Sequence, residues 1–540
     1  MPRTAALPRP AAPPRTTASP RTAALARTGA WRQAPELTRA ARRRTAILAT
    51  GAALLIAAAS GAGTQVRAAA ELTRKPYLQN LGRRQVTIMW RTATPATMTI
   101  EYSEDVSFGL SHTESKPTTH HEVTLADLVP GTKYNYRITE DGRVRAISGT
   151  LTFQTDLGRD DKSFSFFVTG DVGEDDPLEA KQQHTQAMIR TMVPVADFGL
   201  LTGDIIYPDG ASERYDAQLM TPWAGLLCST PVWPTLGNHD WHVDPALNFE
   251  VEWSLPNNEH YYSFDYGNAR FIALDSADKY WFEENEQLAF LARELEKPSD
   301  ATWTFVYYHH PLLTCTYKGD VPEMGAQVMP LFERYGVDVV FTGHAHTYER
   351  LFPIANGLPV DQEQDPYYID PQGTIYVVTG CGGKFKVGKP TTFCGPTAAF
   401  HDESILFTQV FVQDLSLFLV TVNSVTGEIV DVASITKSPT VSDVGLGPAA
   451  RRLQQNIPNP FNPATGIPFE LSAVSRVHLA VYRPDGRWIA NLTDRVYGPG
   501  THRVVWSGLD HSGRPVSSGV YVARLQTEGR SETIKMMLLR

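Results

Sequence analysis

Five apolar runs in the middle of the chain stop at side chains that can hold a metal ion. The runs are "FSFFVTGDVG", "FGLLTGDIIY", "PVWPTLGNHD", "WTFVYYHHP" and "VDVVFTGHAHTYER", and they close on Asp171, Asp204 with Tyr207, Asn238 with His239, His309 with His310, and His344 with His346. One Gly-Asp pair or one His-x-His is a weak signal, because each is more often a turn or a satisfied polar pair. Loops at the carboxyl ends of strands in an open α/β sheet, however, converge on one crevice. Five such endings in order therefore predict one metal site.

The donor chemistry sorts seven of these residues into two ligand sets. A phenol, whose ordinary pKa is about 10, ionises near neutral pH only beside a strongly Lewis-acidic ion, so Tyr207 indicates a trivalent ion. Imidazoles suit iron, zinc and manganese. Asp204 can bridge two ions, and ions about 3.5–4 Å apart can clamp an in-line phosphoryl displacement. We expect a trivalent site made of Asp171, Asp204, Tyr207 and His346, and a divalent site made of Asp204, Asn238, His309 and His344.

The same motifs resemble, in order, the five sequence blocks of the purple acid phosphatases, a branch of the calcineurin-like metallophosphoesterases. They read "GDVG", "GDIIY", "GNHD", "VYYH" and "GHAHTYER", and the resemblance covers roughly Glu71 to Lys437. Most of the wider superfamily begins with Asp-x-His, whereas Val172 and Gly173 follow Asp171 here and Tyr207 takes the place of the missing histidine. All seven residues of the two ligand sets match ligands of that family.

The resemblance implies a fold and a chemistry. The fold would be an αββα sandwich holding Fe(III) beside Fe(II), Zn(II) or Mn(II). A metal-bound hydroxide would attack phosphomonoesters, with His239 contacting the phosphate oxygens; orienting Asn238 is the structural alternative for His239. A phosphodiesterase or nucleotidase on the same scaffold is an alternative function. A cell-surface binding protein with an inactive phosphatase domain is another.

The loop after the fourth block departs from the family pattern. Many relatives place one or two histidines there, but Pro311 to Phe332, "PLLTCTYKGDVPEMGAQVMPLF", contains none. Tyr317 and Lys318 are its available polar groups, so the group that protonates the leaving group stays unassigned. His310, which follows the ligand His309, is interpreted as support for the ligands.

The elements around these motifs predict a multidomain chain with an α/β core flanked by two all-β sandwich domains. Short strands separated by turns fill residues 71–157, where Trp90 and "LVPGTKYNYRI" resemble a fibronectin type III domain with Tyr134 or Tyr136 as its corner tyrosine. Strands alternate with helical stretches, such as "LEAKQQHTQAMIRTM" and "NEQLAFLARELEK", over residues 162–437. Residues 438–450 read as a linker, and residues 451–540 as an immunoglobulin-like β domain.

The two ends of the chain predict export. Within residues 1–70, a basic Ala/Arg/Pro tract is followed by "RRRTAILATGAALLIAAASGAG", which has the layout of a signal peptide. The end of the chain, with "NIPNPFNPATGIPFEL" and "KMMLLR", resembles hook-capping immunoglobulin-like domains and the sorting domains of type IX secretion. This resemblance implies export or cell-surface sorting machinery as a partner; a plain accessory β domain is the alternative.

Charge and cysteine usage add two expectations. The net charge is −9 although the first 44 residues contain ten arginines, so the remainder is acidic and does not favour nucleic-acid binding. The four cysteines Cys228, Cys315, Cys381 and Cys394 have no zinc-type spacing. Disulfides and buried thiols are both allowed, and Cys381 with Cys394 would close the shortest loop.

Overall fold

The computed structural model describes residues 69–538, apart from gaps at 146–150, 157, 160–161, 175–180, 193, 244–245, 278–285, 320, 387–394, 439–452, 457–458, 460, 462, 472–473, 485 and 528–529. The predicted signal peptide and most of the 438–450 linker lie outside the described residues. Within the described part, every helix is too short or too polar to cross a membrane.

Two small sheets form the N-terminal β-sandwich. One contains β1 (Leu72–Gln79), β2 (Val86–Ala96) and β5 (Thr118–Leu125), and the other contains β3 (Thr99–Ser103), β4 (Leu110–Thr113), β6 (Lys133–Glu140), β7 (Arg143–Val144) and β8 (Leu151–Gln154). Trp90 is buried and stacks on His121, with ring centroids 4.7 Å apart. The hydroxyl of Tyr134 accepts a hydrogen bond from the Val129 N–H, 3.0 Å away, so Tyr134 is the corner tyrosine.

The other candidate, Tyr136, ties this sandwich to the central domain instead. Its hydroxyl donates to the backbone carbonyl of Cys228 over 2.8 Å. A buried ion cluster makes a second connection, because Arg74 and Arg91 of the sandwich both pair with the fully buried carboxylate of Glu252. Removing one partner would leave an uncompensated buried charge, so the cluster fixes the two domains against each other.

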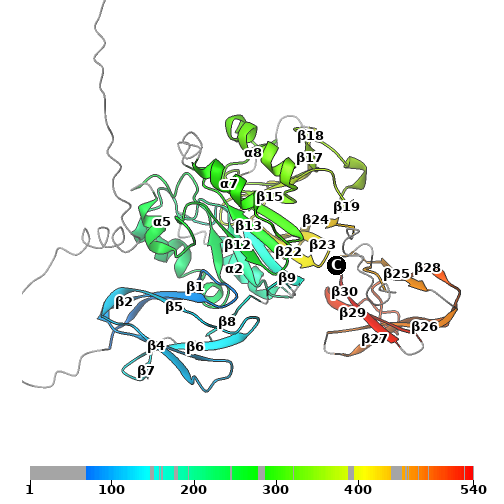
Figure 1. The fold of residues 1–540 in the computed structure, drawn as a ribbon, viewed down its shortest axis with the longest axis horizontal. Helices are drawn as coiled ribbons and strands as arrows, with labels where there is room; N and C mark the ends of the chain where they lie inside the picture. The colour runs from blue at the N-terminus through cyan, green and yellow to red at the C-terminus, as the bar shows by residue number, and fades with distance from the viewer. Residues whose placement is uncertain are drawn as a thin grey trace, which may run out of the picture. The chain divides into compact units, whose positions relative to one another are not determined.

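Two seven-stranded sheets form the central domain (Figure 1). The first sheet has the order β11 (Val232–Pro234), β10 (Phe198–Leu201), β9 (Ser163–Thr169), β22 (Leu406–Gln413), β23 (Ser416–Asn423), β24 (Ile429–Thr436) and β19 (Tyr367–Ile369). The second has the order β12 (Tyr262–Tyr266), β13 (Ala269–Ala273), β14 (Trp303–Tyr307), β15 (Val339–Thr342), β20 (Ile375–Thr379), β16 (Tyr348–Leu351) and β21 (Thr397–His401). A small hairpin joins β17 (Ile354–Ala355) to β18 (Leu358–Pro359).

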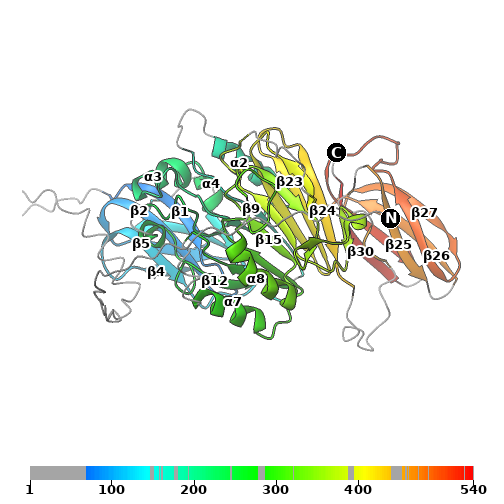
Figure 2. The same ribbon diagram turned by 90° about the horizontal axis from the view of Figure 1, so that it is seen from above.

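Helices cover the outer faces of the two sheets. Figure 2 shows α2 (Lys181–Thr191) and α4 (Ala224–Leu227) on one side, and α7 (Glu286–Glu296) and α8 (Pro322–Tyr335) on the other. The described chain also contains α3 (Ser212–Tyr215), the π-helix η1 (Asp216–Met220), α5 (Leu247–Glu252) and the 3₁₀-helix η2 (Gln362–Gln364). The predicted αββα sandwich is confirmed, as are the two predicted helices, which are α2 and α7.

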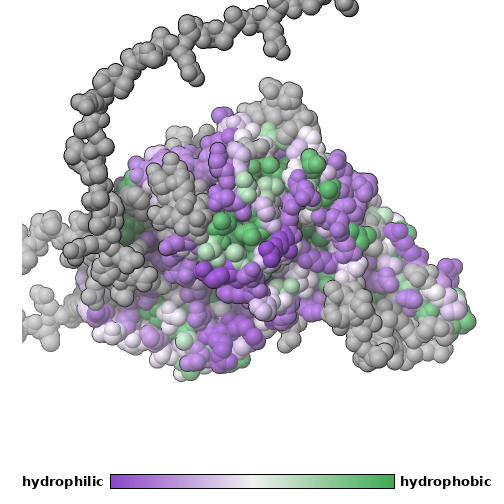
Figure 3. Space-filling view, turned by 45° about the horizontal axis from the view of Figure 1, so that its top comes forward, coloured by the Kyte–Doolittle hydropathy of each residue, from purple (hydrophilic) through white to green (hydrophobic). Residues whose placement is uncertain are grey.

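Successive side chains along the central strands of the second sheet point to opposite faces, and both faces are buried. Phe271, Phe305 and Phe341 face the first sheet, where the Phe166 ring lies 5.2 Å from that of Phe305. Their neighbours Ile272, Val306 and Val340 pack on the other face in a core that includes residues of α7 and α8. Figure 3 shows a surface that is largely hydrophilic, with hydrophobic residues gathered near its middle. The phenylalanines and the aliphatic side chains thus belong to two different cores. This difference specifies the register of the strands, because a shift of one residue would exchange the two faces.

The C-terminal domain is a separate β-sandwich with its own core. It contains the pair β25 (Thr465–Leu471) and β28 (Gly500–Trp506) and the four-stranded sheet β27 (Trp488–Tyr497), β26 (Ser475–Tyr482), β29 (Gly519–Thr527) and β30 (Arg530–Leu538). Trp506, Tyr521, Phe461 and Phe469 are buried in that core.

The cysteines do not form the disulfide that would close the shortest loop. Cys381 is a buried free thiol and Cys228 is also free, whereas Cys315 is disulfide-bonded. Closing the shortest loop, from Cys381 to Cys394, is therefore not the arrangement of this chain.

Candidate metal centre

All five predicted runs are strands, and their carboxyl ends meet where the two sheets lie together. Asp171, Asp204 and Asn238 follow β9, β10 and β11 of the first sheet. His309 and His344 follow β14 and β15 of the second sheet. The sheets are joined directly at this point, because the His309 Nδ1–H donates to the carbonyl of Thr202 over 2.8 Å. That bond leaves His309 Nε2 free to bind a metal.

The first predicted ligand set surrounds the phenol oxygen of Tyr207. This oxygen lies 2.9 Å from Asp171 Oδ1, 3.1 Å from Asp204 Oδ2 and 3.3 Å from His346 Nε2. His346 Nε2 is also 3.3 Å from Asp171 Oδ1. Asp171, Asp204 and Tyr207 are all buried. The four side chains therefore present their donor atoms to one point.

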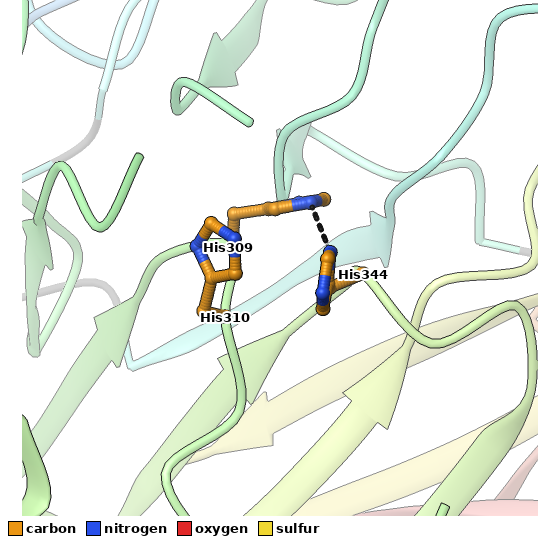
Figure 4. Close-up of side chains that lie close together, drawn as sticks. All are labelled: His309, His310 and His344. Atoms are coloured by element: carbon orange, nitrogen blue, oxygen red, sulfur yellow. Dashed lines mark hydrogen bonds between the residues drawn. The ribbon is translucent and has the colours of Figure 1, made fainter. Parts of the chain in front are cut away.

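The second predicted set surrounds His309 Nε2. This nitrogen lies 3.3 Å from Asp204 Oδ2, 3.3 Å from Asn238 Oδ1 and 3.2 Å from His344 Nδ1. Figure 4 shows the rings of His309 and His344 directed at each other. Asp204 Oδ2 belongs to both sets, as expected of a bridging carboxylate.

These spacings fit a pair of ions. Two atoms that are each about 2.1 Å from one metal, at tetrahedral or octahedral angles, lie about 3.0–3.4 Å apart. The separations given above for the two sets, 2.9–3.3 Å, are close to this range. The sequence pattern thus led to seven side chains that the structure brings together, and Asp171, Asp204 and His309 together form a group able to hold an ion.

Three of the seven residues have a strained backbone. Asp171, Asp204 and His344 have φ angles of 53°, 50° and 67°, a region that residues other than glycine seldom adopt. Neighbouring glycines allow the chains to approach closely: a Cβ on Gly237 would lie 2.1 Å from the Asp204 nitrogen, and one on Gly343 would lie 2.6 Å from the Thr202 carbonyl. Strain of this kind persists only where the surrounding structure enforces it.

The buried carboxylate of Asp240 is one enforcing group that sequence reasoning missed. It accepts hydrogen bonds from the backbone N–H groups of Ile205 (3.0 Å), Ile206 (3.1 Å) and Gly237 (2.9 Å). It therefore ties the loop that carries Asp204 to the loop that carries Asn238. Its place inside "GNHD" was the only signal in the sequence.

Two further supports come from outside the motifs. Gln218 of η1 clamps the Tyr207 backbone, because its Nε2 donates to the Tyr207 carbonyl (2.6 Å) and its Oε1 accepts from the Tyr207 N–H (2.9 Å). The Ser276 hydroxyl accepts from the N–H groups of His309 (3.2 Å) and His310 (2.9 Å). Nothing in the local sequence marks either residue.

His239 lies at the open side of the site. Its Nδ1 is hydrogen-bonded to the carbonyl of Pro208, and its ring centroid is 4.4 Å from that of Tyr207. Its Nε2 lies 3.9 Å from Asp204 Oδ2, and 29% of its side chain is exposed. His239 therefore borders both ligand sets and also reaches solvent.

His310 packs against a ligand of the second set. Its Nδ1 lies 3.0 Å from the Ser276 hydroxyl, and its ring centroid is 4.4 Å from that of His344 (Figure 4). Burial is the main cause that lowers the pKa of His310 to about 3, and the neighbouring His309 lowers this pKa further. His310 is therefore an uncharged packing partner of the ligand rings.

The electrostatics of the ligands suit cations. Burial raises the pKa of Tyr207, and Asp171 and Asp204 raise it further. Burial would lower the pKa of His309, but the charge of Asp204 and their hydrogen bond raise it to about 9. Burial, with His309 and His310, lowers the pKa of His344 to about 2. The two buried carboxylates therefore favour positive charge in the site, whether that charge is a proton on His309 or a bound metal ion.

Two known protein families match this chain. Residues 164–348 match the family described as calcineurin-like phosphoesterase, and residues 74–155 match the family described as purple acid phosphatase, N-terminal domain. The fold and the site therefore define a metallophosphoesterase. Within that class, the chain carries a domain of the purple acid phosphatase N-terminal family in front of its phosphoesterase domain.

Relatives have similar sequences, and a solved structure has a similar fold. Acid phosphatase type 7 of Mus musculus is 25% identical over 338 residues, which cover 55% of this chain and 75% of the relative. Purple acid phosphatase 18 of Arabidopsis thaliana is 28% identical over 282 residues, 49% of this chain and 58% of the relative. The purple acid phosphatase PPD1 of yellow lupin (Lupinus luteus) seeds superposes with a TM-score of 0.61 at 19% identity, over 68% of this chain and 74% of that one.

The matches leave part of each protein uncovered. The chain spans about three quarters of the mouse relative and less than two thirds of the plant relative. Other Arabidopsis thaliana relatives carry the name "probable inactive purple acid phosphatase". Similarity to these relatives therefore does not by itself establish activity, and the argument for activity rests on the residues of this chain.

Proposed function

We propose that this chain is a dinuclear metal-dependent phosphatase that hydrolyses phosphomonoesters. The observation that carries the proposal is the pair of ligand sets that share Asp204 Oδ2, with donor atoms 2.9–3.3 Å apart. All seven side chains are present and converge, which an inactive descendant would not need. This argues against the alternative of a binding protein with a non-functional phosphatase domain.

The donor chemistry supports Fe(III) in the first set and Fe(II), Zn(II) or Mn(II) in the second. Two carboxylates and a phenol favour a trivalent ion, whereas Asn238, His309 and His344 are neutral donors that suit a divalent ion. When bound, the ions would supply an activated water molecule and would neutralise charge on the phosphate.

The chain's own residues hold this arrangement and orient the substrate. Gln218 and Asp240 fix the loops of Tyr207 and Asp204, so that the donor atoms are in place before a substrate arrives. His239 keeps its Nδ1–H on the Pro208 carbonyl, which aims Nε2 at the shared carboxylate. In its imidazolium form, Nε2–H can donate to a phosphate oxygen, so we propose His239 as the catalytic residue that contacts substrate.

A comparison of a monoester with a diester tests the proposal. The metal-loaded full chain is assayed with 4-nitrophenyl phosphate and bis(4-nitrophenyl) phosphate, and metal content is measured on the same sample. We expect two ions per chain and a kcat/KM for the monoester that is at least about 10²-fold higher. A preference for the diester would favour the phosphodiesterase alternative. Full metal occupancy without turnover of either ester would favour the binding protein.

We also propose that the protein is exported to the cell surface or beyond. The basic cluster and apolar stretch before Ala70 support this, as do the sorting-like motifs after residue 451. Expression of the full chain, followed by cell fractionation and N-terminal sequencing, tests it. The expected product lies outside the cytoplasm and begins after Ser60 or Ala70. An intact N-terminus in the cytoplasmic fraction would refute export.

A further inference from the structure

Three lysines border the Tyr207–His346 side of the metal centre. The Lys384 amine lies 3.8 Å from the centroid of the Tyr207 ring. The amines of Lys386 and Lys318 lie 4.3 Å and 5.9 Å from the centroid of the Tyr317 ring. The positive charges thus rest against aromatic rings beside the ligand sets rather than among the ligand atoms.

Two loops that carry these lysines are fastened to the ligand His346. The His346 N–H donates to the Tyr317 hydroxyl oxygen over 3.4 Å, and the Lys386 N–H donates to the His346 carbonyl over 2.9 Å. The Tyr317 hydroxyl proton is therefore available to an acceptor on the substrate. Lys384 lies against the ring of the ligand Tyr207, and Lys318 and Lys386 lie near Tyr317, which is hydrogen-bonded to the ligand His346.

Glu349 holds the loop before Tyr317 in place through hydrogen bonds. The buried carboxylate of Glu349 accepts from the Thr314 hydroxyl over 2.6 Å and from the Cys315 N–H over 3.0 Å. Glu349 belongs to "GHAHTYER", so the motif that supplies two ligands also positions the edge of the site. Tyr317 and Lys318 are consequently fixed relative to the ligands.

The edge formed by Lys318, Lys384 and Lys386 is positively charged, unlike the chain as a whole. The protein has a net charge of −9, yet within the described residues no carboxylate lies within 4.0 Å of the Lys318 or Lys386 amine. Both side chains are exposed. Because both amines lie near the same Tyr317 ring, an anion bound beside that ring would be attracted to both charges.

We propose that Tyr317, Lys318, Lys384 and Lys386 form a second anion subsite, and that the preferred substrate is a phosphate ester with a second phosphate group. The inference rests on the proposed function, in which the metal pair holds the phosphate that is cleaved. The second phosphate lies over the edge formed by the lysines and accepts a hydrogen bond from the Tyr317 hydroxyl. A simple monoester leaves this subsite empty.

Two sugar phosphates that differ only in the second phosphate test the subsite. Initial rates of phosphate release are measured with fructose 6-phosphate and fructose 1,6-bisphosphate at low ionic strength. We expect the metal-loaded wild type to favour the bisphosphate about tenfold in kcat/KM, and to lose most of this preference at about 1 M salt because exposed charges are then screened. The ratio of the two substrates is the readout, because any general loss of activity cancels in it.

Charge-matched variants separate the subsite from net charge. K318Q/K386Q should lower the ratio to within about threefold of one, whereas K318R/K386R should keep it. K116Q/K133Q removes two exposed charges from the N-terminal sandwich and should leave the ratio at the wild-type value. An unchanged ratio in K318Q/K386Q, or a wild type with no preference, would overturn the subsite while leaving the phosphatase proposal intact.

A binding measurement covers the case in which no ester is hydrolysed. Calorimetry compares methylenebisphosphonate with methylphosphonate on the metal-loaded protein. Tighter binding of the bisphosphonate that K318Q/K386Q abolishes would support the subsite even if the proposed activity failed. Equal loss of affinity for both phosphonates in that variant would contradict it.

Discussion

The phenol oxygen of Tyr207 lies 3.3 Å from His346 Nε2, although 139 positions separate the two residues in the chain. Tyr207 follows a strand of the first sheet, and His346 follows a strand of the second. The first sheet alone would carry three ligands of this set, and the second sheet would carry only His346. Because the two sheets pack through Phe166, Phe305 and their neighbours, the hydrophobic core is what completes the metal centre.

Tyr207→Phe should remove the visible absorption of the metal-loaded protein. The wild type should absorb visible light through charge transfer from a tyrosinate to Fe(III), and phenylalanine offers no oxygen to the ion. Absorption spectra and metal analysis of the same samples check this. Tyr317→Phe is the matched control, since Tyr317 is 37% exposed at the edge of the site and outside both ligand sets, and the band should persist. A colourless wild type with two bound ions would contradict the tyrosinate ligand.

Asp204→Asn should lower kcat for 4-nitrophenyl phosphate by roughly 10³-fold or more, because one change weakens both metal sites. Asparagine has nearly the same shape, so the melting temperature of the metal-free protein should change little. Asp209→Asn removes a carboxylate from the same loop that pairs with Arg214, and it should keep activity within about threefold. Near-normal turnover in Asp204→Asn would show that the carboxylate is not shared.

Asp240→Asn should weaken metal binding without touching a ligand. The new amide group would point an N–H at one of the N–H donors of Ile205, Ile206 or Gly237, at a cost of about 1–3 kcal/mol. Loosened loops should lower metal affinity by about 10–100-fold. Competition with a coloured chelator measures the affinity. If affinity matched that of the wild type, other contacts would be holding the two loops.

Stability should fall as the pH rises from about 6.5 to 9 because of the buried His260. Burial would lower its pKa, but hydrogen bonds to Asp275 (3.2 Å) and Glu250 (3.1 Å) raise it to about 9. A folded-state pKa above the unfolded value of about 6.5 means that the folded protein holds the extra proton in this range. The stabilisation is therefore complete below about pH 6.5 and is lost as the pH approaches 9.

The His260→Gln variant isolates this effect. The melting temperature of the wild type should exceed that of the variant most at pH 6, and the difference should shrink by the equivalent of about 1–3 kcal/mol at pH 9. Measurements on chelator-treated samples keep metal loading out of the comparison. A difference that stayed constant with pH would show that folding does not raise the pKa of His260.

The ligands could be predicted because their signal is local. A buried strand in an α/β sheet reads as an apolar run, and the residue that follows it is at the sheet's carboxyl edge, so Asp171 and His344 could be placed without any tertiary information. The helices α2 and α7 were predictable for a similar reason, since their apolar residues recur with helical spacing. Trp90 could also be assigned to the core of the sandwich from strand alternation.

The supporting residues could not be predicted because their partners are distant in the sequence. Ser276 is 33 positions from His309, and nothing near it indicates that its hydroxyl will meet two backbone N–H groups. The helix α8 was missed for a different reason. It contains Gly325 and Pro330, which oppose helix formation locally, and the burial of Met324, Val328 and Phe332 outweighs them. Tyr134 and Tyr136 were indistinguishable until their hydroxyl partners were visible.

The left-handed backbone at Asp171, Asp204 and His344 reveals a trade-off in this protein. Glycine would adopt these φ angles without penalty, whereas each present residue costs on the order of 1 kcal/mol. Glycine would also give up the side-chain atoms that accept hydrogen bonds from the backbone N–H groups of His344 and His239. The two carboxylates thus offset the backbone penalty at their own positions with bonds that hold the neighbouring loops.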